Sequence, residues 1–300
     1  MPPLKYSHIY IIYNPNSTSG TAETRAKRLS SRLAKRGFGN VSILPTKYAG
    51  HAEAIAYRAA SKYKQPLIIS VSGDGGYNEV INGALKAQAE DSSRKPVCAI
   101  LAAGNANDHR RTVRKRPLIM AIMRTEPESI DVLRLQAKYD GNTIVRYAHS
   151  YIGFGLTSTA ASRLNKQHLN RLRETIIVAK ALVHFRFFTI KHPDGKSERL
   201  DSLVFANIHR MSKFVRLGKK TNLHNGKFLV ASVPHYNLFR RFIRVLQIAL
   251  LGYKEKYRAE PFEFSIPYTQ LVHFDGEVMT IPGNSGIIVD AAKEHLLTLR

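Results

Sequence analysis

The segment 66–85, PLIISVSGDGGYNEVINGAL, constrains the fold of this 300-residue chain more than any other. Its apolar start, 67–71, predicts a short buried strand, and the spacing of apolar residues from about Tyr77 predicts an amphipathic helix. Three glycines lie between them: Gly73, Gly75 and Gly76. A strand, a glycine turn and a helix N-terminus together form a cradle for phosphate, because the backbone can approach an anion and offer it N–H donors.

Asp74 stands among these glycines, where its carboxylate would repel a bare phosphate. The segment therefore predicts a magnesium–nucleotide, with Asp74 as a ligand of the metal or as a group that orients the nucleotide. A tight strand-to-helix turn without any ligand is the structural alternative. No GxxxxGK[ST] motif occurs in the chain and the glycine cluster is not GxGxxG, so neither common phosphate motif supports the prediction.

The same alternation of strand and helix runs through the first part of the chain. Apolar runs predict strands at 8–13, 41–44, 67–71 and 97–101, and helical spacing predicts helices at 21–36, 51–63, 77–89 and 117–124. This pattern predicts an α/β domain with a parallel sheet covered on both faces, which binds ligands at the carboxyl ends of its strands. The loops rich in glycine and asparagine fall at those ends.

From Ser129 onward, strands follow one another in succession. They are predicted at 130–135, 143–151, 186–191, 200–208, 228–233, 262–266, 270–274 and 286–290, with a last helix at 291–299. Turn residues at 139–142 and 193–196 join two pairs as hairpins. The pattern predicts a mostly antiparallel β-sandwich with helical insertions at about 156–183 and 236–257.

Four motifs resemble those of the diacylglycerol kinase catalytic domain, a lipid kinase family related to the sphingosine kinases, and they follow one another along the chain in the family's order. Ser72-Gly73-Asp74-Gly75, followed by Asn78-Glu79-Val80 and Asn82-Gly83, is similar to the family's GGDGT/SGDG…NEVxNG signature. The other three are the loop from Asn14-Pro15 to Ser19-Gly20, similar to NPxSG; Thr46, similar to a nucleotide-contacting Thr of bacterial members; and Gly104-Asn105-Ala106-Asn107-Asp108 with Arg111, similar to GTxNDxAR.

The resemblance implies which residues bind ATP with Mg²⁺. They are Asn14, Pro15, Ser19, Gly20, Thr46, Gly73, Gly75, Gly76, Asn78, Glu79, Gly104, Asn105, Asn107 and Asp108. Two departures stand out: Gly76 and Asn105 occupy positions where most relatives have Thr, so phosphate positioning would differ in detail. Bacterial members also hold a structural magnesium ion at an Asp-Gly of the second domain, and the aligned Asn225 brings no charge to such a site.

Asp275-Gly276-Glu277 resembles the DGE motif of bacterial diacylglycerol kinases, in which the acidic pair carries the general base. The resemblance implies that Asp275 takes the proton of the acceptor hydroxyl, with Glu277 as a support or as the alternative base. In sphingosine kinases that role is usually given to the Asp of SGDG, which makes Asp74 a rival base. An ordinary hairpin turn is the structural alternative, since Asp-Gly is a common turn pair.

The predicted organisation has three parts. An α/β nucleotide-binding domain covers 1–126, a β-sandwich lipid-substrate domain covers 127–284, and a strand and helix at 285–300 return to the first domain. In the family that the motifs resemble, the active site lies in the cleft between the two domains.

The chain is strongly basic, with 46 Lys and Arg against 22 Asp and Glu, a net charge of +24. Such a surface attracts polyanions: anionic lipid, nucleotide or nucleic acid. A basic bias throughout the organism's proteins is the alternative. Within 236–257, one helical face carries Leu238, Phe242, Val245, Leu246 and Ala249, flanked by Arg240, Arg241 and Arg244. This helix either packs on the sandwich or lies at an anionic membrane.

The cysteine count, the length of the apolar runs and the N-terminal stretch indicate the compartment in which the protein is expected. The single cysteine, Cys98, allows no disulfide within the chain, and no apolar run reaches the roughly 20 residues that span a bilayer. The N-terminal apolar stretch is too short for a signal peptide. We expect a cytoplasmic protein, soluble or peripherally bound to a membrane. Anionic phospholipids are expected partners, nucleic acid is not, and a homodimer stays open.

The leading hypothesis is an ATP-dependent kinase that phosphorylates diacylglycerol or a similar long-chain lipid alcohol at a membrane surface. A sphingoid base or a polyprenol stays open as the acceptor. The alternative is a non-catalytic basic protein of the same fold that binds anionic lipid or nucleic acid. Retention of Asp74, Asp275 and Glu277 argues against that alternative, because a pure binding protein has no use for them.

Overall fold

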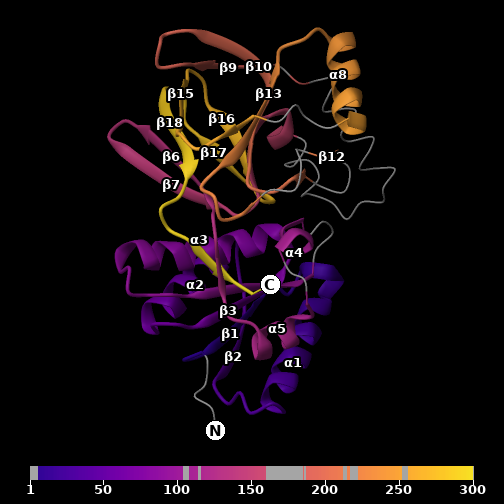
Figure 1. Cartoon of the computed structure of the whole chain (residues 1–300), viewed down its shortest axis with the longest axis vertical. Coiled ribbons are helices and arrows are strands. Elements are labelled where there is room, and N and C mark those ends of the chain that lie inside the picture. Colours follow the sequence, from indigo (N-terminus) through magenta and orange to yellow (C-terminus); the bar gives the residue numbers. More distant parts are fainter. Residues whose placement is uncertain are drawn as a thin grey trace. The chain divides into compact units, whose positions relative to one another are not determined.

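The computed structural model describes residues 6–103, 108–113, 116–159, 185, 187–211, 215–216, 222–251 and 256–299. The chain divides into two compact units, 1–131 with 293–300, and 132–292 (Figure 1). The boundary between them thus follows Asp131 rather than residue 126. The second unit extends to Ala292, beyond the predicted end at 284.

The first unit is an α/β domain, as predicted. Its strands are β1 (Ile9–Tyr13), β2 (Val41–Pro45), β3 (Leu67–Ser72), β4 (Val97–Ala102), β5 (Glu128–Ile130) and β19 (Leu296–Thr298), in the order β2-β1-β3-β4-β19-β5. The strands β1 to β4 are parallel, whereas β5 runs antiparallel to β19. The carboxyl ends of β1 to β4 therefore lie along one edge of the sheet, where α/β domains bind their ligands.

Helices cover both faces of this sheet (Figure 1). They are α1 (Thr21–Ala34), α2 (His51–Lys62), α3 (Asp74–Glu90), α4 (Asp108–Val113) and α5 (Leu118–Arg124), with a short 3₁₀ turn, η1 (Ser17–Gly20), before α1. A Cβ at Gly83 of α3 would lie 2.8 Å from the backbone nitrogen of Tyr57 and against the carbonyl oxygen of Glu53, both in α2. The close packing of α2 on α3 therefore accounts for the last glycine of the motif.

The second unit is antiparallel, as predicted, and among the described residues eleven strands join into one curled sheet (Figure 1). These strands are β6 (Leu133–Tyr139), β7 (Asn142–Ala148), β8 (Tyr151–Gly155), β9 (Phe188–Lys191), β10 (Ser197–Ala206), β13 (Phe228–Pro234), β14 (Tyr257–Arg258), β15 (Phe262–Ile266), β16 (Gln270–Phe274), β17 (Glu277–Ile281) and β18 (Ser285–Ala291). Phenylalanines at 154, 188, 205 and 264 form the centre of its core. Two short strands, β11 (Arg210–Met211) and β12 (Val215–Arg216), pair separately, and the helix α8 (Leu238–Leu251) follows β13.

The C-terminal segment differs from its prediction. The strand at 286–290 is confirmed, but β18 pairs with β15 and β6 inside the second unit. The helix predicted at 291–299 is wrong, because residues 296–298 form β19, which pairs with β4 and β5 of the first unit. Closely spaced leucines fit a helix as well as a strand, and only these distant partners decide between them. In the described part of the chain, no helix is long and apolar enough to cross a membrane.

Candidate active site

The helix α3 begins at Asp74 rather than near Tyr77, so that Gly75 and Gly76 lie in its first turn and not in a loop. Gly73, in an extended conformation, precedes it, and its carbonyl accepts the first helical hydrogen bond from the N–H of Tyr77 at 3.2 Å. The N–H groups that precede Tyr77 have no acceptor within the helix. They lie directly after β3, at the carboxyl edge of the sheet, in the arrangement that binds phosphate.

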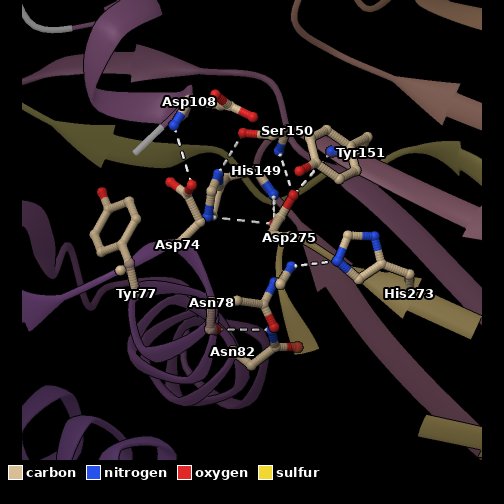
Figure 2. Close-up of polar contacts among 12 residues, drawn as sticks. Asp74, Tyr77, Asn78, Asn82, Asp108, His149, Ser150, Tyr151, His273 and Asp275 are labelled. Carbon is tan, nitrogen blue, oxygen red and sulfur yellow. Dashed lines mark hydrogen bonds and ion pairs between the residues drawn. The ribbon is translucent and has the colours of Figure 1, made fainter. Parts of the chain in front are cut away.

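Asp74 connects the starts of two helices (Figure 2). Its Oδ2 accepts a hydrogen bond at 3.0 Å from the backbone N–H of Asp108, the buried first residue of α4. Nearby, the Nη1 of Arg25 donates to the carbonyl of Ala102 at 2.7 Å and fixes the end of β4. The predicted Gly104, Asn105 and Asn107 lie outside the described residues.

The loops after β1 and β2 lie at the same edge. The Oδ1 of Asn14 accepts from the N–H of Asn16 at 2.9 Å, which shapes the loop that carries Pro15 towards η1, where Ser19 lies. Gly20 ends η1 with a φ of +83°, a value that favours glycine. Thr46 follows β2, and its N–H donates to the carbonyl of Tyr13 at 2.9 Å. The structure thus brings these predicted nucleotide residues to the strand ends near Gly73 and Asp74.

Glu79 and Asn78 make contacts within the protein. The carboxylate of Glu79 accepts from the N–H of Gly50 at 2.9 Å and of Ala52 at 3.1 Å, and thereby caps the start of α2. Asn78 is buried, and its side-chain oxygen accepts from Asn82 at 3.1 Å. These contacts give both residues a structural role that sequence reasoning missed, since Gly50 lies 29 positions from Glu79. Their assignment to the nucleotide stays a prediction.

The absence of Thr at position 76 has a steric reason. A Cβ at Gly76 would lie 2.7 Å from the Oγ and 2.8 Å from the Cβ of Ser72, the last residue of β3. The hydroxyl of Ser72 in turn bonds that of Ser70 at 2.6 Å. Ser72 therefore fills the space that a side chain at position 76 would need.

We expect Gly76→Thr to lower the free energy of unfolding by about 1–3 kcal/mol, the usual cost of overpacking. Adding Ser72→Gly should recover part of this loss, and urea unfolding of the two single variants and the double variant measures the coupling. Gly39→Thr is the control, because a Cβ at Gly39 has nothing within 4 Å. Strictly additive effects would contradict a steric link between residues 72 and 76.

Asp275 occupies the hairpin between β16 and β17 with a φ of +51°, and it is fully buried. Its Oδ1 accepts from the backbone N–H groups of Ser150 at 2.9 Å and Tyr151 at 2.8 Å, and its Oδ2 accepts from that of His149 at 2.6 Å (Figure 2). The Nε2 of His149 lies 3.3 Å from the same Oδ2. Asp275 thus joins this hairpin to the connection between β7 and β8.

The neighbours of Asp275 complete the turn. The N–H of Gly276 donates to the Nε2 of His273 at 2.8 Å, so this nitrogen carries no proton. Burial lowers the pKa of His273 to about 4, which keeps the ring neutral. Glu277 is exposed. The DGE segment is therefore a hairpin turn with one buried and one exposed carboxylate, and its role as the general base stays a prediction.

Asn225 lies in an exposed turn, where its Oδ1 accepts from the N–H of Lys227 at 3.1 Å. Across the described ranges, no three His, Cys, Asp or Glu side chains come together as a metal site. A magnesium ion that is held mainly by nucleotide phosphates needs only one or two carboxylates from the protein. Asp74, beside the N–H groups at the start of α3, fits this requirement, whereas Asn225 offers one neutral oxygen already used in its turn.

Comparison with known proteins finds similarity in both sequence and structure. The diacylglycerol kinase catalytic domain matches residues 8–135. A diacylglycerol kinase of Bacillus subtilis (strain 168) is 25% identical over 250 residues, which cover 81% of this chain and 78% of that protein. The crystal structure of a diacylglycerol kinase from Bacillus anthracis str. Sterne covers 98% of this chain and 97% of its own, with a TM-score of 0.65 and 16% identity. The structural likeness shows the fold, and the sequence matches support a lipid kinase.

Proposed function

We propose that this chain, whose residues 8–135 belong to the diacylglycerol kinase catalytic-domain family, is an ATP-dependent kinase that phosphorylates diacylglycerol or a similar long-chain lipid alcohol. The observation that carries the proposal is the place of Asp74 in the first turn of α3, at the carboxyl end of β3. A carboxylate beside phosphate-binding N–H groups is useful only when a cation accompanies the phosphates. That combination favours a nucleotide substrate over a simple anion.

Transfer of the γ-phosphate requires an oriented nucleotide and a compensated phosphate charge. In our proposal the N–H groups at the start of α3 orient the phosphates, with the loops at Asn14–Gly20 and Thr46 beside them. Mg²⁺ would be held by Asp74 and would supply charge neutralisation when bound. The hydrogen bond from Asp108 to Asp74 keeps that carboxylate in one orientation.

The proton of the acceptor hydroxyl also needs a carboxylate to receive it. Both oxygens of Asp275 already accept hydrogen bonds from backbone donors, and the side chain is buried. Glu277 is exposed, two residues further along the same turn. We therefore assign the base to Glu277 and the positioning of the turn to Asp275. The family resemblance instead implies Asp275 as the base, with Glu277 as its support or alternative and Asp74 as a rival.

The proposal predicts that the purified protein transfers labelled γ-phosphate from Mg²⁺–ATP to a lipid. Vesicles that contain diacylglycerol, a sphingoid base or a polyprenol should be compared in parallel, with the labelled lipid extracted and separated. We expect diacylglycerol or another long-chain alcohol to be labelled, and a variant with Asp74→Asn to label it about 10³-fold more slowly. A protein that binds ATP but labels none of these alcohols would contradict the assigned acceptor class.

A further inference from the structure

A buried ion pair fixes the helix α8 to the sheet of the second unit. Arg241 of α8 donates from Nε to one carboxylate oxygen of Asp201 at 2.9 Å and from Nη2 to the other at 3.0 Å, and both residues are buried. The Nδ1 of His235 lies 2.9 Å from the same carboxylate. Asp201 belongs to β10, so this network anchors the first turn of α8. Arg241 is therefore a structural residue and not, as predicted, a charge that flanks the apolar face.

The opposite side of α8 is exposed and apolar. Phe239 is 74% exposed and Phe242 is 59% exposed, and Leu238 and Ile243 are exposed beside them. Helical spacing places Phe239, Phe242 and Ile243 away from Arg241 and from Ile248, which is buried, while Leu238 lies at the edge between the two sides. The exposed face thus differs from the apolar face predicted from the sequence. The structure does not describe the side chains of three residues of that predicted face, Val245, Leu246 and Ala249. We call Leu238, Phe239, Phe242 and Ile243 the outer face of α8.

The charge of the segment that contains α8 indicates what covers the outer face. No Asp or Glu occurs between Asp201 and Glu255, whereas the same segment holds five Lys and five Arg, of which Arg241 is paired with Asp201. Among them, Arg240 is exposed within α8 itself. A second copy of the chain on this face would bring two such basic segments together, at a cost in repulsion. An anionic lipid surface instead accepts both the apolar side chains and the positive charge.

We propose that the outer face of α8 docks on an anionic lipid bilayer. Phe239 and Phe242 enter the boundary between headgroups and acyl chains, and Arg240 contacts headgroup phosphates. The Asp201–Arg241 pair holds the helix so that this face points away from the sheet. The inference goes beyond the kinase proposal, and its test contains no nucleotide, so that each can fail alone.

The test measures sedimentation of the full chain with two kinds of vesicle: phosphatidylcholine alone, and phosphatidylcholine mixed with phosphatidylglycerol. We expect binding only to the anionic vesicles, reduced by added salt. The double variant Phe239→Ser with Phe242→Ser should bind at least about tenfold more weakly, because partial burial of each ring contributes of order 1 kcal/mol. Arg240→Gln should weaken binding about fivefold, since one basic residue near an anionic surface contributes about 1 kcal/mol.

Matched variants control for the loss of exposed apolar area and of charge. Tyr268→Ser with Leu271→Ser removes an exposed aromatic and an exposed aliphatic side chain elsewhere on the second unit, and Lys138→Gln removes an exposed charge on β6. Both should bind vesicles like the unchanged protein. Equal binding to neutral vesicles, or equal losses in the control variants, would overturn the proposal. A dimer in light scattering that the Phe239/Phe242 variant abolishes would also overturn it. Salt-dependent binding to duplex DNA, without binding to vesicles, would overturn it as well.

Discussion

Replacing Asp275 with Asn should lower the free energy of unfolding by roughly 3 kcal/mol, because hydrogen bonds to a charged group contribute about 1.5–3 kcal/mol and this carboxylate is buried. Three backbone N–H groups point at its two oxygens. An amide turned either way places its own NH₂ group against at least one of these donors. The variant should therefore lose the link between the β16–β17 hairpin and residues 149–151, as urea unfolding of the pure protein would show.

Glu277→Gln provides the matched control, since it changes an exposed carboxylate of the same turn. Its free energy of unfolding should stay within about 0.5 kcal/mol of the unchanged protein, as for most surface substitutions. Its turnover should fall by roughly 10²–10⁴, the contribution of a positioned general base. The reverse pattern, with full stability but lost turnover for Asp275→Asn and normal turnover for Glu277→Gln, would make Asp275 the base.

The alternation of elements in the first unit could be predicted because each helix and strand shows its own periodicity. The stripe Ala22, Ala26, Leu29 and Leu33 of α1 is buried as expected. The start of α3 could not be placed, because glycines are typical of loops and here lie in a helical turn. Likewise, β19 forms only through pairing with β4 and β5, and nothing in its own three residues distinguishes a strand from a helix.

Residue types at the candidate site could be predicted, but their contacts could not. Asp275 meets donors 124 to 126 positions away, and Arg241 meets Asp201 across 40 positions. A motif shows that a carboxylate or a guanidinium is present, whereas burial and partners depend on the completed fold. For this reason the sequence assigned Asp275 to chemistry and Arg241 to the surface, and the structure gives both of them buried partners.

The substitution Asp74→Asn should reduce phosphoryl transfer by about 10³-fold and leave the fold intact. Loss of one preorganised electrostatic partner of the reacting phosphates costs turnover of this order. Asn keeps an oxygen that can still accept the hydrogen bond from the N–H of Asp108, so the link between α3 and α4 should persist. What disappears is the negative charge that would hold Mg²⁺. Turnover measured against Mg²⁺ concentration, together with thermal unfolding, checks both halves of this expectation.

Glu79→Gln is the control for this prediction, because it removes a second carboxylate of α3 that caps α2. Because its carboxylate already accepts from two N–H groups of α2, we expect Glu79→Gln to lower the free energy of unfolding by about 1 kcal/mol with little change in turnover. A large loss of turnover would instead place Glu79 at the nucleotide, as the family resemblance implies. The two variants remove the same charge from the same helix, so their opposite outcomes are decisive: one loses turnover at constant stability, and the other loses stability at constant turnover. Near-normal turnover of Asp74→Asn at every Mg²⁺ concentration would contradict a role of Asp74 in holding Mg²⁺. Its role would then be structural, connecting the starts of α3 and α4.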